Sequence, residues 1–556
     1  MRFFILFFLI TQTPWFVQAG SVTRSQYESS TELQADQLVL TADARESNGS
    51  TSWKSDLSPV LRDMLNALEV MQDSYFDMFS GTWLGAIDWT SAVMGTHVSA
   101  TLASIVSFLD AASTSSCSEL LSWQNLIDRY YAQTSAFYFG ENAFALRNQA
   151  YDDMLWVVLG WLENLKFAEM YSLKHWDFAE SGGQSTSSSG WHGLQIIPMA
   201  AHRARVFYDL ASAGWDDSLC GGGMTWNPYL SPYKNAITNE LFAAASIGMY
   251  LYFPGDNNTS PYMTSSSKGS MKPHDPSYLE NAIKSYKWIM ESQMRNHEGL
   301  YQDGFHVTGW RRYRNGTINP GTGNCDDLNH MVYTYNQGVM LSASRGLWLA
   351  TGARSYLEDG HALIESVVRA SGWPNKDWRW AGLGRGGVME EFCDHRGYCS
   401  QDGQTFKGIF FHHLSEFCRP LWPQEEAFLA SDSRTTDFDR DVYEYHLARC
   451  GAYDKWVAHN SEAALATRNS DGHFGMWWTS RNPSHNTMTQ IHQSTILPIG
   501  ADDHLNPKAQ DWSDRPAAPY DRNDRGRGRT VETQSGGLAV LRARWNWQVY
   551  FSQAST

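Results

Sequence analysis

Basic residues are scarce in this sequence: 43 Lys and Arg stand against 59 Asp and Glu, which gives a formal net charge of −16. Binding to nucleic acid or to an anionic lipid surface requires clustered positive charge. The basic cluster at 521–529 is interleaved with aspartates, and we interpret it as a solvated segment. The composition therefore predicts a protein without a nucleic-acid partner.

Long apolar runs are missing after the first ten residues. The run from Met1 to Ile10, followed by Val17 and Ala19 at a small-residue site, predicts a signal peptide over residues 1–19 that is too short to span a bilayer. We expect no spanning membrane segment elsewhere. The last residues also lack the hydrophobic tail of a GPI signal. We expect a secreted, extracellular protein, with cell-wall association as the alternative.

Signatures of metal and nucleophile sites are absent as well. The sequence has no CxxC pair with zinc spacing, no HExxH motif and no GxSxG elbow, so we expect no metal and no cofactor. The seven cysteines are an odd number, and Cys393 and Cys399 close a short loop that predicts a disulfide. Four sequons predict N-glycosylation sites at Asn48, Asn257, Asn258 and Asn315.

Strand-like alternation is rare, whereas helical periodicity dominates residues 57–500. About a dozen amphipathic segments need a closed arrangement to bury their apolar stripes, and six helical hairpins in a ring provide one; bundles and solenoids are the alternatives. We interpret residues 20–56 as a polar linker or N-terminal extension. Residues 501–556 are expected to form a polar C-terminal tail with a short helix. The domain between them is expected to be all-α.

Asp152 and Asp153 stand together before the Trp-rich apolar segment that continues to Tyr171. An acid at this position is a favoured helix cap, and this pattern by itself favours capping over catalysis. If one of the two lies outside the helix, both carboxyls could face one cleft, near the separation used by retaining glycosidases. Crowded carboxylates also push their pKa values apart, which gives one ionised and one protonated group.

Two further segments combine polar and aromatic residues. In 220–242, a Gly-rich turn and Trp226 precede a helical pattern, and this arrangement suits either a hydroxyl-rich ligand or a hydrogen-bonded loop. In 333–341, two amides begin a helical pattern, and Asp303 lies in an earlier loop as ligand or turn former. The polar side chains in these segments are Lys234, Asn235, Asn239, Glu240, Asn336 and Gln337. The abundant rings, 24 Trp and 26 Tyr, suit sugar stacking or helix packing.

Taken in order, the blocks "YDDMLWVVLGWL", "GWDDSLCGGGMTWN", "SPYKNAITNELFAAAS", "LYQDG", "YTYNQGVMLSA" and "GVMEEFCDHRGYCSQDGQTFKGIFFHHL" resemble glycoside hydrolase family 76, the endo-α-1,6-mannanases and their fungal cell-wall relatives. The resemblance covers roughly residues 57–480. It implies an (α/α)6 barrel and cleavage of α-1,6-mannan with retention. It also implies that Asp152 is the nucleophile and Asp153 the general acid/base.

The same resemblance implies which residues line the substrate cleft: Trp226, Asn227, Lys234, Asn235, Asn239, Glu240, Asp303, Tyr335, Asn336 and Gln337. The expected partner is a mannan or mannoprotein polysaccharide, bound by a monomer. Two alternatives use the same cleft. One is a transglycosidase that links GPI-anchored mannoproteins to the fungal cell wall, and the other is a mannan-binding protein without catalysis.

Overall fold

A computed structural model of the protein describes residues 57–111, 117–137, 149–175, 191–258, 272–375, 377–431, 440–480, 485–503 and 521–551. The expected signal peptide, the segment 20–56 and the sequon at Asn48 lie outside these ranges. The chain divides into two units, Met1–Leu57 and Ser58–Thr556, and everything described below belongs to the second.

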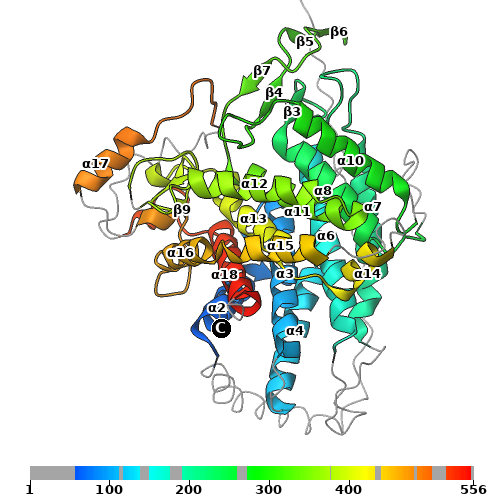
Figure 1. Ribbon diagram of the computed structural model, residues 1–556, viewed down its shortest axis with the longest axis vertical. Coiled ribbons are helices and arrows are strands. Elements are labelled where there is room, and N and C mark those ends of the chain that lie inside the picture. Colours follow the sequence, from blue (N-terminus) through cyan, green and yellow to red (C-terminus); the bar gives the residue numbers. More distant parts are fainter. Residues whose placement is uncertain are drawn as a thin grey trace, which may run out of the picture. The chain divides into compact units, whose positions relative to one another are not determined.

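Six helices form a closed inner ring (Figure 1), in which each helix packs against the next and the last packs against the first. In chain order they are α3 (Asp88–Ala111), α6 (Tyr151–Ser172), α8 (Ala236–Tyr252), α11 (Thr334–Thr351), α13 (Gln401–Cys418) and α18 (Val531–Tyr550). An inner helix has neighbours on nearly every side, so its sequence is largely apolar all round, as in "AITNELFAAASIGMYLY" of α8.

Six outer helices surround this ring: α2 (Pro59–Tyr75), α4 (Cys117–Ser135), α7 (Ile197–Ser212), α10 (Pro276–Glu291), α12 (Ser355–Ala370) and α16 (Asp454–Leu465). Each precedes one inner helix in the chain. An outer helix buries a single stripe, as Leu61, Leu65, Leu68 and Met71 do at helical spacing on α2. Ser58 caps α2 by accepting a hydrogen bond from the Leu61 amide at 3.3 Å. The predicted (α/α)6 barrel is confirmed.

Shorter helices complete the described helical structure. They are α14 (Pro423–Ser431), α15 (Arg440–Gly451), α17 (His485–Ser494) and four 3₁₀ turns at His192–Ile196, Asp394–Arg396, Trp478–Ser480 and Arg522–Asp524.

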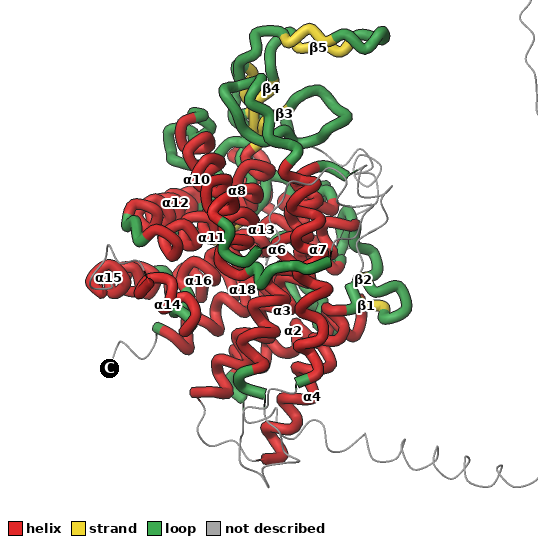
Figure 2. The backbone as a smooth tube through the Cα atoms, turned by 90° about the vertical axis from the view of Figure 1, so that its right-hand side faces the viewer, coloured by secondary structure: helices red, strands yellow, loops and turns green. Residues whose placement is uncertain are grey.

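Short antiparallel strands occupy the loops, mostly at one end of the ring (Figure 2). The pairs are β1 (Phe76–Asp77) with β2 (Thr82–Trp83), β5 (Trp310–Arg312) with β6 (Ile318–Pro320), and β8 (Gly384–Arg385) with β9 (Val388–Met389). A three-stranded sheet has the order β3 (Tyr233–Asn235), β4 (Gly304–His306), β7 (Asp327–Asn329). In its register Gly304 lies opposite Asn235, and a Cβ added to Gly304 would lie 2.6 Å from the Asn235 Cα. Glycine is therefore needed for this close pairing.

The C-terminal segment differs from the expected polar tail. Its helix α18 has 20 residues and is buried along most of its length, as the sixth member of the inner ring. The expected domain end at 500 is wrong for this reason. At Gly536 the helix approaches Gly408 of α13 so closely that a Cβ on Gly408 would lie 2.9 Å from the Gly536 Cα.

Helix α3 also corrects an expectation. Asp88–Leu109 is long and apolar enough to cross a membrane by length and composition, although we expected no such stretch. In the ring, 83% of its apolar window is buried against the protein. Its apolar character follows from that position.

Three disulfides join cysteines of the described chain. Cys393 pairs with Cys399, as the short loop predicts, and the other bridges are Cys220–Cys325 and Cys418–Cys450. Cys117 is the seventh cysteine. Of the remaining predicted glycosylation sites, Asn257, Asn258 and Asn315 are exposed, and their modification stays a prediction.

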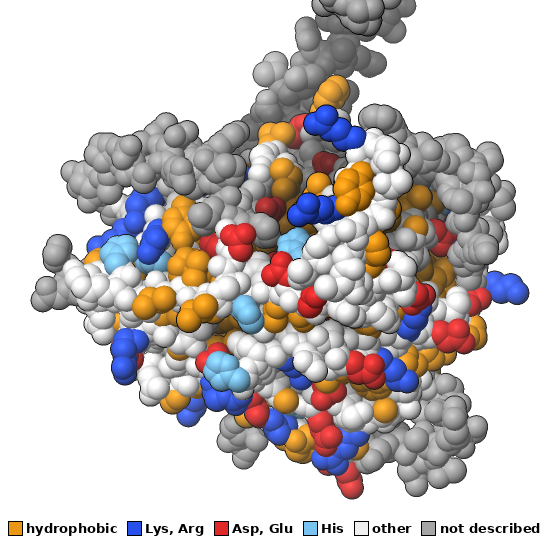
Figure 3. All heavy atoms as spheres, turned by 90° about the horizontal axis from the view of Figure 1, so that it is seen from above, with side chains coloured by type: hydrophobic (Ala, Val, Ile, Leu, Met, Phe, Trp, Pro, Cys, Tyr) orange, Lys and Arg blue, Asp and Glu red, His pale blue; other side chains and the backbone are white. Residues whose placement is uncertain are grey.

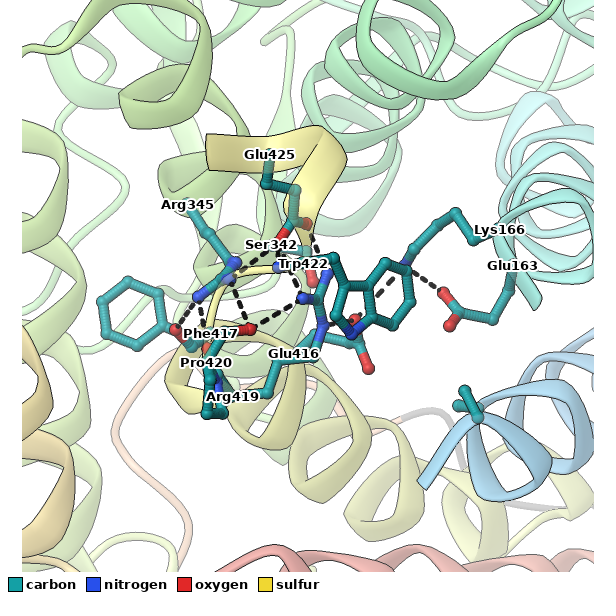
Figure 4. A network of polar contacts seen from close by, with 12 residues as sticks. Glu163, Lys166, Ser342, Arg345, Glu416, Phe417, Arg419, Pro420, Trp422 and Glu425 are labelled. Atoms are coloured by element: carbon teal, nitrogen blue, oxygen red, sulfur yellow. Dashed lines mark hydrogen bonds and ion pairs between the residues drawn. The ribbon is translucent and has the colours of Figure 1, made fainter. Parts of the chain in front are cut away.

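A buried charge network joins the inner helices α6, α11 and α13 in their C-terminal halves (Figure 4). Glu416 of α13 accepts hydrogen bonds from Lys166 at 3.2 Å and Arg419 at 2.8 Å, and it pairs with Arg542 of α18. Arg419 and Arg345 both bind Glu425, at 2.6 and 3.1 Å. Glu416 lies 14 residues after Asp402 on α13, which is about 21 Å along a helix.

Candidate active site

A cavity of about 320 Å³ opens at the end of the ring where the inner helices α6, α11 and α13 begin. Figure 3 shows the face seen from above, where hydrophobic, acidic and basic side chains surround a hollowed centre. The lining residues of the cavity are Trp89, Asp152, Asp153, Trp156, Trp226, Tyr233, Asn235, Asp303, Tyr333, Tyr335, Glu391, Phe392, Cys393, Tyr398, Ser400, Asp402, Gly403, Phe406 and Asp503. Six of these side chains are acids, and none is Lys or Arg.

Asp152 and Asp153 both line this cavity, from the first turn of α6. The cap residue is Ala150, which makes no side-chain cap bond, so neither aspartate is the N-cap. The helix already includes both, contrary to the idea that one lies outside it. The Asp153 amide donates to Asp152 Oδ1 at 3.0 Å. The preceding Tyr151 amide donates to the Trp226 carbonyl at 2.9 Å, so the Gly-rich loop holds the start of the helix.

Burial raises the pKa of both carboxyls. For Asp152 the next cause is the charge of Asp153, while hydrogen bonds from the Asp153 amide and from Trp226 oppose the rise in pKa. For Asp153 the pKa rises to about 7, with additional contributions from the charges of Asp402 and Asp88. Two coupled acids of this kind share a proton near neutral pH. The pair can thus provide one carboxylate and one carboxylic acid, which is the requirement of acid-assisted covalent catalysis.

The other cavity acids are oriented by neighbouring donors. Tyr233 donates to Asp303 Oδ2 at 2.5 Å and Asn329 donates to the same atom at 3.2 Å. The Trp89 indole donates to Asp402 Oδ1 at 3.2 Å. These bonds come from the β3–β4–β7 sheet and from α3, so the loops and the ring together hold Asp303 and Asp402 in place.

Aromatic rings supply flat apolar walls. Trp89 stacks on Trp156 with ring centroids 5.6 Å apart, and Tyr335 stacks on Phe406 at 3.8 Å. Trp226 lies in the loop beside Asp152. Flat rings next to fixed hydrogen-bonding groups match the two faces and the hydroxyl edges of a sugar.

Of the predicted binding residues, Trp226, Asn235, Asp303 and Tyr335 line the cavity. The others do not. Lys234 is fully buried and donates to the carbonyls of Gly223 at 2.6 Å and Asp216 at 2.8 Å; burial lowers its pKa to about 8. Its role is to hold the Gly-rich loop, which corrects the expected contact with substrate.

Asn239 and Gln337 each hold a loop in place through the same pattern of hydrogen bonds. Asn239 accepts from the Met224 amide and donates to the carbonyls of Met224 and Asn235. Gln337 accepts from the Tyr301 amide and donates to the carbonyls of Tyr301 and Tyr333. Each of these two side-chain amides thus fixes the loop that precedes its own helix. Gln337 thereby positions the chain two residues before Asp303.

Glu240, Asn336 and Asn227 also lie off the cavity. Glu240 and Asn336 are fully buried on α8 and α11, and burial raises the pKa of Glu240 well above its usual range. Asn227 accepts from the Tyr229 amide at 2.8 Å in a local turn. None of these three side chains lines the cavity, which corrects their expected place in the cleft. For Glu240 and Asn336 the reason is that a polar side chain buried inside the barrel and one that faces a ligand give the same sequence signal.

Glu391 is a cavity residue that the sequence did not single out. One of its oxygens accepts hydrogen bonds from the amide (3.1 Å) and hydroxyl of Thr334, and the other has no hydrogen-bond partner among the described residues. Burial raises its pKa to about 8. A protonated carboxylic acid in this position can donate to a ligand oxygen. The adjacent pair "EE" gave no signal, because only the loop after α12 turns Glu391 toward the cavity.

Glu391→Gln should change how stability depends on pH. The folded-state pKa lies above the unfolded value of 4.5, so the wild type loses stability as pH rises through about 8. Glutamine cannot ionise and keeps an acceptor for Thr334, so the variant should gain stability relative to wild type at pH 9 and differ less at pH 5. Chemical denaturation at both pH values measures this. Equal differences at both pH values would contradict a raised pKa.

The sequence profile and the relatives found by comparison with known proteins agree with one another. Residues 201–427 match the sequence profile described as "Glycosyl hydrolase family 76". The chain is 24% identical over 223 residues to the mannan endo-1,6-alpha-mannosidase DCW1 of Candida glabrata, covering 39% of this chain and 40% of that protein. It is 28% identical over 213 residues to the mannan endo-1,6-alpha-mannosidase DFG5 of Saccharomyces cerevisiae, covering 36% and 35%. The chain spans about two fifths of the length of the curated relatives it matches.

A similar fold is found in Dfg5 from Chaetomium thermophilum, solved in complex with glucosamine. The TM-score is 0.50 at 14% sequence identity, and the match covers 88% of this chain and 91% of that one. The family profile begins after α6, so it does not include Asp152 and Asp153. Their assignment depends on the geometry of the cavity.

Proposed function

We propose that this chain, which belongs to glycosyl hydrolase family 76, is a retaining glycosidase that cleaves α-1,6-mannosidic linkages in the mannan backbone. The observation that carries the proposal is the Asp152–Asp153 pair, two carboxyls that line one cavity and whose pKa values are both raised by burial. The aromatic walls and the absence of Lys and Arg from the cavity lining fit a neutral sugar chain. The relatives' described activity agrees with this substrate class.

In the proposed mechanism Asp152 is the nucleophile. Its carboxyl accepts hydrogen bonds from the Asp153 amide and Trp226, which oppose the rise in its pKa, and in its ionised form it attacks the anomeric carbon to form a glycosyl ester. Asp153 gives its proton to the departing glycosidic oxygen as that bond breaks. It then takes a proton from water, whose oxygen displaces Asp152 and releases the sugar with its original anomeric configuration.

The direct test is incubation with unbranched α-1,6-mannan, with the anomer of the first product followed by NMR. The proposal predicts shorter α-1,6-oligosaccharides released as the α anomer. Release of the β anomer, or no cleavage of this polymer, would overturn it. Addition of a second sugar as acceptor separates hydrolysis from transfer, because a transglycosidase would lengthen the acceptor rather than release free ends.

The pH dependence of kcat/KM tests the role of Asp153. Because the pKa of Asp153 is about 7 and its acid form is required, kcat/KM on mannan should fall as pH rises above about 7. A mannoside with an activated leaving group needs no proton transfer to depart, so its alkaline decline should be much weaker. An identical decline for both substrates would assign the ionisation to another group.

We also propose that the protein acts outside the cell, because three disulfides and exposed sequons at Asn257 and Asn315 fit an oxidising, secretory location. Detection of N-glycans on the protein purified from culture medium tests it. Recovery of the unmodified chain only from cell extracts would contradict it.

A further inference from the structure

The β5–β6 hairpin extends outward from the sheet that borders the cavity (Figures 1 and 2). Strand β4 begins one residue after Asp303 and leads into β5, and β6 leads back to β7, whose Asn329 bonds Asp303. Arg311 is eight residues from Asp303, which is at most about 26 Å of extended chain. The hairpin is therefore within reach of a glycan chain that leaves the cavity.

This hairpin is held firmly at its base. The Cys220–Cys325 disulfide joins it to the Gly-rich loop, and the Cys220 amide donates to the Gly323 carbonyl at 2.9 Å. The Thr308 amide donates to Asp326 at 2.8 Å across the base. At Gly321, where φ is +64°, an added Cβ would lie 2.2 Å from the Thr308 carbonyl oxygen. These contacts fix the hairpin relative to the loop that carries Trp226.

The charge of the hairpin is opposite to that of the cavity. Segment 310–324 has three arginines, Arg311, Arg312 and Arg314, and no acid, in a chain whose net charge is −16. All three are exposed, and among the described residues they form no ion pair, whereas most arginines of the barrel bind carboxylates. Three exposed cations that have no acidic partner are available for an anionic ligand.

Aromatic and apolar groups accompany these cations. Trp310 and Arg312 lie two residues apart on β5, so they share one face, and the Arg312 guanidinium is 5.9 Å from the Trp310 ring centroid. Their cross-strand partners are Pro320 and Ile318. An aromatic ring beside a guanidinium fits a sugar that carries a negative substituent, because the ring stacks on the sugar while the guanidinium binds the anion.

We propose that the β5–β6 hairpin binds anionic substituents, phosphodiester or carboxylate, on a glycan whose neutral backbone occupies the cavity. The inference deepens the proposed function and rests on it for the identity of the backbone. The six acids of the cavity disfavour a negatively charged sugar there, while the hairpin attracts it. The charge separation therefore orients the glycan and selects chains that are substituted away from the cleavage point.

The test uses the triple variant Arg311→Gln, Arg312→Gln, Arg314→Gln. A control with the same change in net charge is Arg62→Gln, Lys287→Gln, Arg440→Gln, at exposed positions on α2, α10 and α15. N-glycans are removed from every protein, because Asn315 lies at the turn of the hairpin. The probes are neutral α-1,6-mannan, the same polymer carrying phosphodiester groups, and the same polymer carrying uronate groups.

Binding is measured by calorimetry at low and high salt. Wild type and control should prefer the substituted polymers about tenfold over the neutral one, and this preference should disappear in the hairpin variant and at high salt. A preference for both polymers identifies the negative charge itself as the ligand, and a preference for one identifies its chemical source. A preference that survives in the hairpin variant, or no preference in wild type, overturns the proposal.

Vesicles of phosphatidylcholine with and without phosphatidylserine form a further arm. Arginine-dependent binding to the anionic vesicles, without a preference among the polymers, would replace the glycan by a lipid surface and overturn the proposal. Because no binding measurement requires turnover, a protein that prefers the anionic polymers but does not cleave mannan refutes the proposed function while the hairpin site stands.

Discussion

Asp152→Asn is expected to lower kcat/KM on α-1,6-mannan by roughly 10⁴-fold or more, because loss of a covalent nucleophile removes the whole two-step pathway. Asp153→Asn should cost about 10²–10⁴-fold on the same polymer, the range of general acid–base catalysis. The two losses should separate on a mannoside with an activated leaving group. Asp153→Asn should recover much of its first-step rate on that substrate, and Asp152→Asn should recover none.

Added azide distinguishes the two roles further. With Asp152→Ala, azide can enter the space of the missing carboxylate and give a mannosyl azide of inverted configuration. With Asp153→Ala, azide can intercept the ester on Asp152 and give the retained azide. The exchange of these two products between the variants would reverse the assigned roles. Asp73→Asn, an exposed acid on α2 paired with Arg129, is the control and should leave the rate unchanged.

The fold was largely predictable, because the distribution of apolar residues can be read directly from the sequence. Inner helices are apolar nearly all round, whereas outer helices have a single apolar stripe. The exception is α18, whose "TQSGGLAVLRARW" contains two glycines and two arginines. Gly408 of α13 permits the close approach to α18 at Gly536, and Arg542 is buried against Glu416 and Ser104. Both features depend on partners more than 100 residues away, so no local periodicity could identify this helix as part of the ring.

The site was predictable only in part, for a related reason. Asp152 and Asp153 were identifiable from their position in a chain of motifs, whereas polar residues near them divided into two groups that sequence does not separate. Asp303 and Asn235 line the cavity, but Lys234, the neighbour of Asn235, and Gln337 donate to loop carbonyls instead. Whether a polar side chain lines the cavity or binds a loop carbonyl depends on the direction in which the loop presents it. That direction depends on strand register and on close glycine contacts.

The buried network around Glu416 offers the largest expected effect on stability. Three cations, Lys166, Arg419 and Arg542, contact this one carboxylate, and their charges hold its pKa well below its usual range against the effect of burial. The Arg419 guanidinium also lies 3.8 Å from the Trp422 ring centroid (Figure 4). Since the folded-state pKa is depressed, the stabilising contribution of Glu416 is fully present above the unfolded value of 4.5 and is lost as pH falls below it.

Glu416→Gln keeps the shape of the side chain but leaves three buried cations facing a neutral amide, so the free energy of unfolding should fall by about 3–5 kcal/mol at pH 7. The difference from wild type should shrink on acidification below pH 4.5, because the unfolded wild-type carboxyl then binds a proton that folding must release. Denaturant titration at pH 7 and pH 4 measures both effects. Glu358→Gln is the matched control, since its half-exposed pair with Arg354 should contribute less than about 1 kcal/mol. A loss for Glu416→Gln no larger than that of the control would mean that water, rather than the carboxylate, compensates these cations.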